Sequence, residues 1–494
     1  MARIAIMGGG ATGLGAAFLL KRASEAGADV EFELYERDSR LGGKVAGEIV
    51  PDPETGEPFI IDGGPDCFTA RKPAAMRVAK LAGIEDQKLP SQESKKGTYI
   101  WRGDRKYHLP EGFSMFVPTK LAPVFETGLL TEEGKRELLR DLVVPKKEIE
   151  PDAFNDETLE SFIVRRFGRE VLDYLAEPFI GGVHASAPET MSLRSSFPMY
   201  LDMEQKYGSV IRGTVMGMKA RERAAAGKPK DPNNTMFATF RLGLHQLTDA
   251  MADAAGREHL HTGCAVSSVR AEGEGSSTRY VIDFEDGSRE MFDGVVIATE
   301  SYAAARVLKD MNPEMAQAYE GIPNLTSSTC SFGFRAEDIT LPESGFGTLV
   351  PAVENRALLA ATWSSTKWSN RAPEGRVLIR GFAGTPHNQD LMEKSDEEIT
   401  AIVLSELKEI MDIKPDAEPL FSRFYRWTLG MSQYTMGHLD RVETIERICE
   451  NTHGLAAAGG CFRGVGVPNC IAGGEKAALK LLADCGIDYF EEIS

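Results

Sequence analysis

Six residues near the start of the chain, Gly8-Gly9-Gly10-Ala11-Thr12-Gly13, have the types and spacing of a loop that holds a dinucleotide diphosphate. In the pattern G-x-G-x-x-G, Gly8 permits a tight turn, Gly10 lets the backbone approach the pyrophosphate, and Gly13 lets the following helix pack closely on the strand. The helix then presents unpaired N–H groups and the positive end of its dipole to the diphosphate.

The elements around this loop support that chemistry. A short apolar strand at 3–7 precedes it, a helix at 12–26 follows, and a second strand is predicted at 30–36. Glu36 ends the second strand, where an acid that binds the ribose belongs. A dinucleotide-binding fold is therefore predicted in place of a ligand-free glycine turn.

Two further glycine segments favour FAD over NAD. Arg40-Leu41-Gly42-Gly43-Lys44 places glycines just after the acid, as flavoproteins of the amine-oxidase type do, and Asp62-Gly63-Gly64-Pro65-Asp66 is expected to bring backbone against the flavin. A second dinucleotide loop is not apparent, because Gly273-Glu274-Gly275 reads as a polar hairpin turn. NAD(P)H is therefore not the expected electron partner, and oxygen or another acceptor is implied.

The C-terminal stretch from Ala457 to Pro468 is the second cofactor signal. It contains Gly460, Val465, Gly466 and Val467, and Pro468 opens a helix without wasting a backbone donor. The N-terminus of such a helix, aimed at the N1–C2=O edge of the flavin, would stabilise the anionic reduced flavin. Cys461 in this stretch is interpreted as a small buried thiol, not as a covalent attachment point.

The order of elements predicts an α/β fold: a discontinuous Rossmann-like FAD domain with an inserted mixed-sheet substrate domain and a helical domain. The strand at 294–298 and the closing strand and helix at 455–458 and 468–483 return to the first unit. Helices are expected at 131–142, 159–167 and 395–411, and an exposed loop at 221–234. The expected ranges are 1–94, 232–302 and 440–494 for the FAD domain, 95–116 and 303–439 for the substrate domain, and 117–231 for the helical domain.

Composition excludes several classes of function. A net charge of −18 repels phosphate backbones, so nucleic acid is not an expected partner. The seven cysteines have no C-x-x-C pair and suit a reducing cytosol, and the eight histidines lack metal-ligand spacing, so no metal site is expected. The N-terminus is itself a strand and no apolar run could span a bilayer. We expect a cytoplasmic protein without a transmembrane segment, for which peripheral membrane contact stays open.

Four segments of the chain resemble the protoporphyrinogen/coproporphyrinogen oxidase family. They are Gly64-Pro65-Asp66-Cys67-Phe68-Thr69-Ala70-Arg71-Lys72, the stretch from Glu177 to Pro198, Thr362-Trp363-Ser364-Ser365-Thr366-Lys367-Trp368, and Arg463-Gly464-Val465-Gly466-Val467-Pro468-Asn469-Cys470. The likeness runs nearly end to end. The first and third segments most resemble the coproporphyrinogen III oxidase branch of Gram-positive-type bacteria.

This resemblance implies FAD as cofactor and a set of site residues. The FAD contacts it implies, together with those expected from the glycine segments, are Gly8, Gly9, Gly10, Ala11, Thr12, Gly13, Glu36, Arg37, Gly43, Lys44, Gly63, Gly64, Pro65, Asp66, Val266, Trp427, Gly460, Val465, Gly466 and Val467. The expected porphyrinogen-binding residues are Arg71, Lys72, Gly182, His184, Leu349, Trp363 and Phe382. Arg71 and Lys72 are the best local cations for propionate carboxylates on an otherwise acidic chain, with solvated loop charges as the alternative.

The implied reaction removes hydrogens from a porphyrinogen and leaves the conjugated porphyrin, in heme biosynthesis. Hydride leaves a meso carbon for flavin N5, molecular oxygen reoxidises the flavin to give peroxide, and the product can be handed to a chelatase of the heme pathway. No Ser-His-Asp arrangement or metal is required, and we assign no catalytic residue, because the flavin is the catalyst and the protein orients the ring.

Alternatives remain at this point. Coproporphyrinogen III is the preferred substrate and protoporphyrinogen IX the nearest rival; they differ by propionates against vinyls, so more cations favour the former. An amine oxidase, a carotenoid desaturase or a non-catalytic flavoprotein would share the fold. His184 and Ser186 depart from the family pattern, and His184 is either a residue that titrates near a propionate or a structural histidine.

Overall fold

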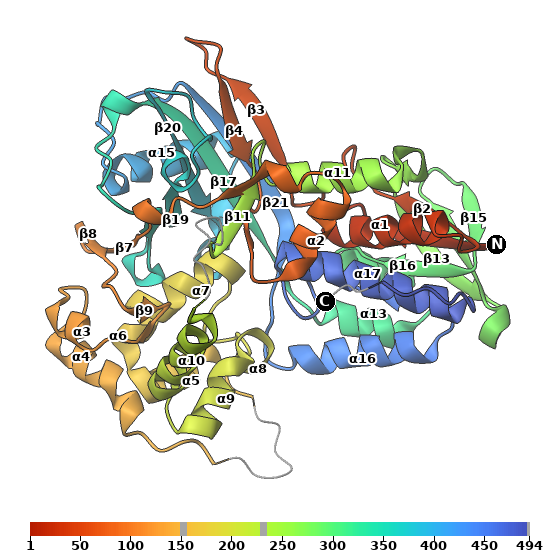
Figure 1. Cartoon of the computed structure of the whole chain (residues 1–494), viewed down its shortest axis with the longest axis horizontal. Helices are drawn as coiled ribbons and strands as arrows, with labels where there is room; N and C mark the ends of the chain where they lie inside the picture. The colour runs from red at the N-terminus through yellow and green to blue at the C-terminus, as the bar shows by residue number, and fades with distance from the viewer. Residues whose placement is uncertain (149–155, 228–234, 492–494) are drawn as a thin grey trace.

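The computed structural model describes residues 1–148, 156–227 and 235–491 (Figure 1). A five-stranded parallel sheet lies at one end, in the order β12-β2-β1-β16-β22. Its strands are β1 (Ala2–Met7), β2 (Val30–Tyr35), β12 (Leu260–His261), β16 (Gly294–Ile297) and β22 (Leu455–Ala457). The strands predicted at 3–7, 30–36, 294–298 and 455–458 are confirmed, and so is their return to a single sheet.

Helices cover one face of this sheet and a mixed layer covers the other. The first face packs on α1 (Ala11–Glu25), α2 (Pro73–Leu81), α11 (His245–Ala255) and α17 (Val467–Asp484). The second packs on the antiparallel strands β13 (Val266–Glu272), β14 (Arg279–Phe284) and β15 (Arg289–Phe292), and on α12 (Ser301–Leu308), α13 (Pro313–Glu320) and α16 (His438–Asn451). Since α12 and α13 share a core with β1, the boundary expected at residue 302 falls inside this unit and not at its edge.

Helices α1 and α17 approach each other closely because a glycine of each helix faces the backbone of the other. A Cβ atom at Gly15 would lie 2.7 Å from the carbonyl oxygen of Ile471, and one at Gly474 would overlap the carbonyl oxygen of Thr12. Burying these small residues brings the two backbones together. The glycine loops that precede the two helices, far apart in sequence, therefore belong to one site.

The second layer is a seven-stranded mixed sheet in the order β21-β17-β20-β19-β18-β7-β8, at the upper left of Figure 1. Its strands are β21 (Phe421–Ser432), β17 (Asn324–Arg335), β20 (Arg376–Ala383), β19 (Leu358–Trp363), β18 (Gly347–Leu349), β7 (Thr98–Arg102) and β8 (Arg105–His108). Neighbours are antiparallel except β18 and β7. Helix α15 (Asp396–Ile410), which begins with a capping box at Ser395, packs on one face.

Short elements join the two sheets. The ribbon β3 (Gly47–Pro51) with β4 (Pro58–Asp62) and the small sheet of β5 (Phe68–Thr69), β11 (Phe237–Phe240) and β6 (Lys88–Pro90) lie between them. The short helix α14 (Ser364–Lys367) follows β19.

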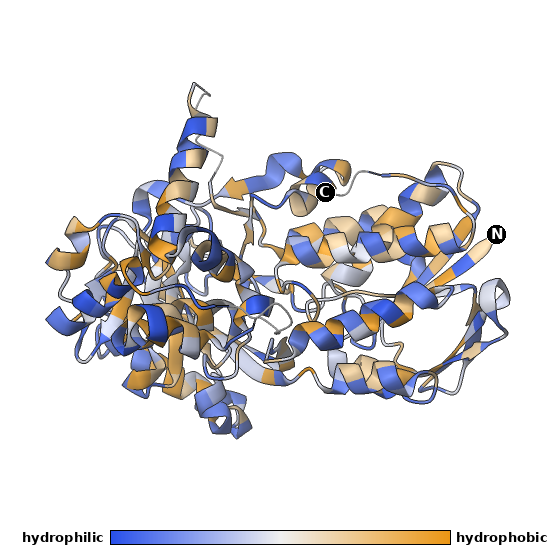
Figure 2. Ribbon diagram, turned by 90° about the horizontal axis from the view of Figure 1, so that it is seen from below, coloured by the Kyte–Doolittle hydropathy of each residue, from blue (hydrophilic) through white to orange (hydrophobic). Residues whose placement is uncertain are grey.

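The third unit is helical and lies at the lower left of Figure 1. After β9 (Phe113–Ser114) and β10 (Val117–Pro118) come α3 (Ala122–Glu126), α4 (Glu132–Leu139), α5 (Leu159–Phe167), α6 (Arg169–Val171), α7 (Glu177–His184), α8 (Leu193–Ser196), α9 (Pro198–Tyr207) and α10 (Val210–Ala225). In Figure 2 the helices alternate between orange and blue residues, as amphipathic helices do. Among the described residues, none of the helices has the length and apolar character that a membrane span requires.

Helix α10 corrects one expectation. Residues 221–225, predicted as part of an exposed loop, continue α10 as far as Ala225. Their Arg, Glu and Ala residues are good helix formers, and the loop prediction gave too much weight to the glycine and prolines that follow. The rest of the predicted loop, from 228 to 234, lies outside the described residues.

Candidate flavin and substrate site

The N-terminal glycine loop lies between β1 and α1, and Gly10 caps the helix. Gly8 has φ +103°, and a Cβ atom there would lie 2.7 Å from the carbonyl oxygen of Ala298; a Cβ at Gly13 would overlap the carbonyl oxygen of Gly8. At Gly10 the nearest atom would be 3.9 Å away. Gly8 and Gly13 are thus required by the polypeptide itself, whereas Gly10 leaves open space of the kind that a diphosphate needs.

Glu36 is held against this loop. Its carboxylate accepts hydrogen bonds from the backbone N–H groups of Gly9 (2.6 Å) and Asp38 (2.8 Å). The N–H of Cys264 donates to the Glu36 carbonyl oxygen at 2.8 Å, which brings the buried Val266 close to the same strand end. Arg37 is exposed and lies 3.4 Å from the Asp38 carboxylate. Glu36 and Val266 therefore stand where the nucleotide half of FAD is expected.

The segment Leu41–Lys44 packs directly on the loop. The N–H of Gly42 donates to the Gly9 carbonyl oxygen at 2.8 Å, and Gly42 and Gly43 have φ +94° and +54°. Lys44 pairs with Glu300, which follows β16, at 2.7 Å. The sequence segment that favoured FAD is thus in contact with the diphosphate loop.

Side chains from the mixed sheet hold the second glycine segment, Gly63–Asp66. The Gly63 carbonyl oxygen accepts hydrogen bonds from Thr329 Oγ1 (2.7 Å) and Trp427 Nε1 (3.0 Å). Arg380 Nη2 donates to the Gly64 carbonyl oxygen. The FAD unit and the mixed sheet are joined at the segment that the sequence places against the flavin.

A largely buried ion pair ends this segment. The Asp66 carboxylate lies 2.7 Å from Lys367 Nζ and accepts a hydrogen bond from Trp368 Nε1 at 3.1 Å. Burial alone would raise the pKa of Asp66, but the charges of Lys367 and Arg380 outweigh it and hold this pKa well below its ordinary value. Asp66 is therefore a fixed anion and not a proton acceptor at neutral pH.

The residues that anchor Gly63–Asp66 were not predicted individually, apart from Trp427. They are Thr329, Lys367, Trp368 and Arg380. They lie on strands and loops more than two hundred residues away, so no local pattern could point to them. One signal was available: Lys367 and Trp368 end a segment that carries the family resemblance.

The C-terminal loop leads into α17, whose first turn contains no acidic residue. Gly466 is the N-cap and Val467 the first helical residue, so the unpaired N–H groups of this helix begin at Gly466. Cys461 is 2% exposed, and burial raises the pKa of its thiol to about 12. The interpretation of Cys461 as a small buried thiol agrees with this environment.

Strand register decides which expected substrate residues lie together. Leu349 pairs with Ala360, and Ala360 pairs with Phe382, so these three side chains share one face of the mixed sheet. Arg380, two residues before Phe382, is on the same face and its guanidinium lies 4.6 Å from the Phe382 ring centre. This face is continuous with the Gly63–Asp66 segment.

Trp363 lies elsewhere than expected. It pairs with Ile379, three residues from both Ala360 and Phe382 in the respective strands, and therefore lies on the opposite face. There it is fully buried in the core with Val403 and Leu407 of α15. Trp363 was expected to bind the porphyrinogen along with Leu349 and Phe382, but it does not share their face, because its register position and not its residue type sets the face.

The remaining expected residues occupy three environments. Lys72 is exposed, and its Nζ lies 2.7 Å from Oδ1 of Asn469 in the first turn of α17; Arg71 beside it is exposed as well. His184 is buried with its ring 5.5 Å from that of Phe197, and burial lowers its pKa to about 4, which favours the structural interpretation. Gly182 belongs to α7, but its surroundings lie outside the described residues.

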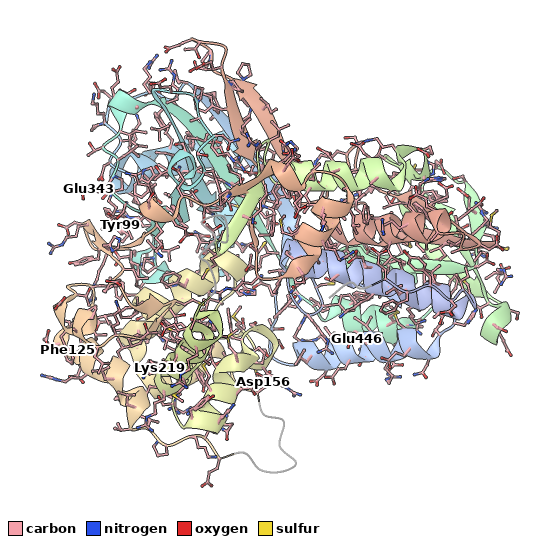
Figure 3. All side chains as sticks on the ribbon, viewed as in Figure 1. Tyr99, Phe125, Asp156, Lys219, Glu343 and Glu446 are labelled. Carbon is pink, nitrogen blue, oxygen red and sulfur yellow. The ribbon has the colours of Figure 1, made fainter. Side chains whose placement is uncertain are left out.

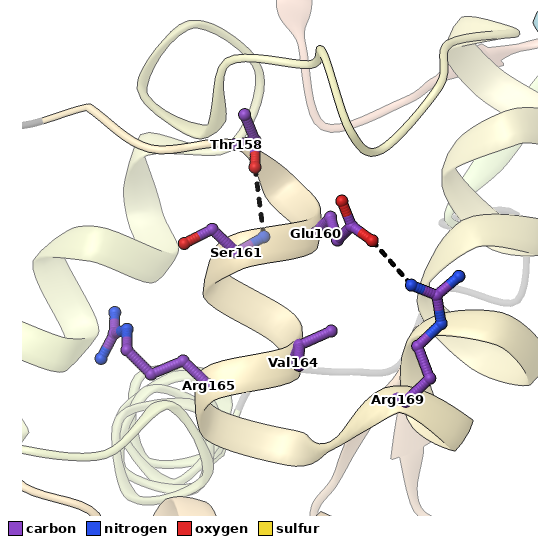
Figure 4. A pocket seen from close by; sticks show the side chains of 6 residues that line it. All are labelled: Thr158, Glu160, Ser161, Val164, Arg165 and Arg169. Atoms are coloured by element: carbon purple, nitrogen blue, oxygen red, sulfur yellow. Dashed lines mark hydrogen bonds and ion pairs between the residues drawn. The ribbon is translucent and has the colours of Figure 1, made fainter.

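A surface pocket on the helical unit lies apart from these residues. The one in Figure 4, of about 430 Å³, is lined by Thr158, Glu160, Ser161, Val164, Arg165 and Arg169. Most of its polar groups already have partners in the protein: Thr158 caps α5 through the Ser161 N–H at 3.1 Å, and Glu160 pairs with Arg169 at 2.6 Å. Arg165 pairs with Glu157 and Glu204 at 2.8 and 2.7 Å. In the described part of the chain, His, Cys, Asp and Glu residues form no cluster that could hold a metal ion.

Together these residues fit FAD. Gly10 offers backbone without a side chain, Glu36 stands at the end of β2, and two helices present N-termini free of acidic residues. Apolar Phe382 and Leu349 adjoin the segment at which the flavin ring is expected.

Comparison with known proteins agrees with an FAD-binding fold. Residues 11–482 match the family described as flavin containing amine oxidoreductase. The coproporphyrinogen III oxidase of Bacillus subtilis (strain 168) is 30% identical over 97% of both chains, and protoporphyrinogen oxidase 2 of Arabidopsis thaliana is 26% identical over 100% of this chain and 95% of that protein. The crystal structure of a candidate protoporphyrinogen oxidase from Exiguobacterium sp. 255-15 superposes with a TM-score of 0.80, at 28% identity over 97% of this chain and 99% of that one. The chain belongs to the flavin-containing amine oxidoreductases, in their coproporphyrinogen and protoporphyrinogen oxidase branch, and its cofactor is FAD.

Proposed function

We propose that this protein oxidises coproporphyrinogen III to coproporphyrin III, with molecular oxygen as electron acceptor and peroxide as product. The observation that carries the proposal is the full-length likeness to a coproporphyrinogen III oxidase, 30% identity over 97% of both chains. Protoporphyrinogen IX is the second candidate, because protoporphyrinogen oxidases also match this chain over its full length.

The geometry supports a substrate with an apolar ring and anionic edges. Leu349, Ala360 and Phe382 form an apolar face next to the Gly63–Asp66 segment. Lys72 places an exposed ammonium group at the first turn of α17, where the helix dipole adds to its positive charge. The apolar face suits a macrocycle, and an exposed cation suits a propionate carboxylate.

FAD supplies the hydride acceptor for this chemistry. The residues proposed to hold it are those of the three glycine segments with Glu36, Val266 and Trp427. The polypeptide orients the porphyrinogen. Phe382 and Leu349 contact the apolar surface of its macrocycle, and Lys72 and Arg71 bind its carboxylates. Arg380 fixes Gly64 next to this surface. Lys367 neutralises the fixed charge of Asp66, so neither residue is proposed to accept a proton from the substrate.

The proposal also covers the acceptor of the electrons and the transfer of the porphyrin product. Each pair of electrons taken from the porphyrinogen reduces one O₂ to peroxide, and the porphyrin product would pass to a chelatase that inserts metal. The protein is proposed to act in the cytoplasm, at most in peripheral contact with a membrane.

Steady-state kinetics test the substrate assignment. We expect kcat/KM to be higher for coproporphyrinogen III than for protoporphyrinogen IX, measured by porphyrin fluorescence and by peroxide formation against heat-inactivated protein. A clear preference for protoporphyrinogen would favour the second candidate. Failure to oxidise either porphyrinogen, in protein that carries FAD, would contradict both.

Substitution of Lys72 tests the carboxylate contact. In Lys72→Met we expect KM for coproporphyrinogen III to rise about tenfold with a small change in kcat, because a charge-assisted contact to substrate is lost. Lys80→Met is the matched control, since Lys80 is an exposed residue in the last turn of α2. Equal KM values in the two variants would show that Lys72 is a solvated loop charge.

A further inference from the structure

Tyr434, in the segment between β21 and α16, ties together the two ends of the C-terminal glycine loop. The side chain is 2% exposed. Its hydroxyl group donates to the carbonyl oxygen of Gly460 at 2.7 Å and accepts from the N–H of Gly464 at 2.9 Å. One oxygen atom therefore satisfies backbone groups at both ends of the Gly460–Gly464 turn.

His438, in the first turn of α16, holds the middle of the same turn. Its ring stacks on Tyr434, with centroids 4.0 Å apart and an interplanar angle of 14°. Its Nε2 lies 2.8 Å from the carbonyl oxygen of Phe462, so a neutral ring with the proton on Nε2 donates there. Burial lowers the pKa of His438 to about 4, which keeps the ring neutral at physiological pH.

This turn determines how α17 begins. Gly464 has φ +143°, and a Cβ atom there would overlap the side chain of Asn469. Two residues later Gly466 caps α17. Outside the turn, Arg463 pairs at 2.6 Å with Glu446, which Figure 3 labels on α16. The direction of the α17 N-terminus thus depends on a bend that Tyr434 and His438 hold from within.

The backbone of Tyr434 is in turn fixed by the helical unit. The N–H of Ser192 donates to the Tyr434 carbonyl oxygen at 2.8 Å, and the N–H of Met436 donates to that of Thr190 at 3.1 Å. Ser186 Oγ also donates to the side chain of the preceding residue, Gln433, at 2.6 Å. The stretch from Glu177 to Pro198, which is distinctive in the sequence, therefore reaches the flavin loop through this tyrosine.

We propose that Tyr434 is a positioning residue for FAD, which acts by holding the Gly460–Gly464 turn so that the N-terminus of α17 faces the flavin. Its hydroxyl is not expected to contact substrate, and the proposal does not depend on which porphyrinogen is oxidised. It rests on the binding of FAD at this loop, and it gives the helical unit a part in tuning the cofactor.

Tyr434→Phe tests this role, because it removes the hydroxyl and keeps the ring that stacks on His438. We expect the dissociation constant of FAD, measured by titration of apoprotein, to rise about tenfold, because the loop loses two hydrogen bonds. We also expect the flavin reduction potential to become more negative, since a misdirected helix dipole stabilises negative charge on the flavin less well.

Tyr280→Phe is the matched control. Tyr280 is fully buried, and its hydroxyl donates to the carbonyl oxygen of His453 at 2.6 Å, away from the glycine turn. Both variants should lose similar thermal stability, but Tyr280→Phe should keep the wild-type potential and FAD affinity. A Tyr434→Phe protein with wild-type values, or the same shifts in both variants, would overturn the proposal.

His438→Gln is the second test variant, to be used if Tyr434→Phe does not fold. It keeps an N–H donor for the Phe462 carbonyl oxygen and removes the stacked ring, so a smaller shift of the potential in the same direction is expected. An unchanged potential would again contradict the proposal. Because the readouts are FAD affinity and potential, they remain decisive even if the wild-type protein oxidises no porphyrinogen.

Discussion

Gly10 and Gly13 lie three residues apart, yet a methyl group would meet different surroundings at each. At Gly13 it would overlap the carbonyl oxygen of Gly8, whereas at Gly10 it would meet nothing closer than 3.9 Å. Gly10 also has an extended backbone with φ −76°, which any residue can adopt. The two positions of one motif therefore require glycine for different reasons: Gly10 leaves space for the ligand, and Gly13 allows the fold.

This difference predicts two outcomes. Gly10→Ala should fold with nearly wild-type stability without FAD and bind FAD at least tenfold more weakly, because the methyl occupies the space of the diphosphate. Gly13→Ala should lose stability in the apoprotein itself, by about 2 kcal/mol or more, because the clash is internal. Urea unfolding of both apoproteins, with FAD titration, compares them. Equal losses of apoprotein stability would show that the two glycines are not separable.

Arg380 is the residue that joins the flavin segment to the substrate face. It is 3% exposed, donates to Gly64 and stacks on Phe382, and its Nε has no hydrogen-bond partner among the described residues. Burial lowers its pKa from the ordinary value, and the charges of Asp66 and Asp62 oppose that effect. Its positive charge thus helps to balance two buried carboxylates.

Arg380→Met should destabilise the folded protein by about 3 kcal/mol, because it leaves the Gly64 carbonyl without a donor and a buried carboxylate less well compensated. Arg380→Lys should recover part of that loss. Chemical unfolding of the two variants measures the difference. Arg270, a half-exposed arginine paired with Asp283 at 2.9 Å, gives the control Arg270→Met, for which a loss below about 1 kcal/mol is expected.

At the scale of elements, helix α7 docks the helical unit onto the mixed sheet. A π-helical turn, Leu172–Ala176, leads into it, and Glu177 at its start is 8% exposed. The Glu177 carboxylate accepts from the N–H of Ala352, beyond β18, at 3.1 Å. Burial, and more weakly Glu189 and Asp173, raise the pKa of Glu177 to about 7, against the Ala352 hydrogen bond that lowers it.

This shift predicts a pH dependence of folding. The folded state binds the Glu177 proton more tightly than the unfolded chain, so its contribution to stability is complete below about pH 4.5 and is lost as the pH rises through 7. Glu177→Gln should match the wild type near pH 4.5 and exceed its unfolding free energy at pH 8 by on the order of 2–3 kcal/mol. The control is Glu25→Gln, at an exposed position. The same pH profile in Glu177→Gln and the wild type would contradict the assignment.

At the scale of the whole molecule, the proposed FAD site is assembled from segments near the two ends of the chain. The loops at 8–13, 63–66 and 460–467 meet because α1 packs on α17 and because the mixed sheet holds Gly63–Asp66. A ligand that bridges such segments binds the folded state and not the unfolded chain, so it should stabilise the entire protein.

Removal of FAD should therefore lower the midpoint of thermal unfolding, and added FAD should restore it. At a free FAD concentration about one hundred times its dissociation constant, the unfolding free energy should increase by about 2.7 kcal/mol. Differential scanning calorimetry at several FAD concentrations measures it, and Gly10→Ala should show a smaller gain at each concentration. A midpoint independent of FAD would mean that the three loops do not form one binding site.

Local sequence patterns determined much of this protein. The helix predicted at 12–26 is α1 at Ala11–Glu25, the helix predicted at 395–411 is α15, and the glycine segments lie at strand and helix ends as expected. These features follow from periodicity, caps and glycine conformation, which act over a few residues. The family resemblance rests on similarly short segments, which is why the cofactor and the reaction class could be predicted before the fold.

Tertiary structure alone decided the rest. Trp363 lies on the α15 face because β19 pairs with β20 in one register, and a shift of one residue would reverse it. The partners of Gly63–Asp66, the tie between Tyr434 and the glycine turn, and the position of α12 and α13 in the first core all join residues far apart in sequence. Short-range sequence patterns cannot predict such contacts, because the contacts depend on how distant parts of the chain pack together. Sequence thus determined the cofactor, and the packing of two sheets and a helical unit decided which side chains lie at its proposed site.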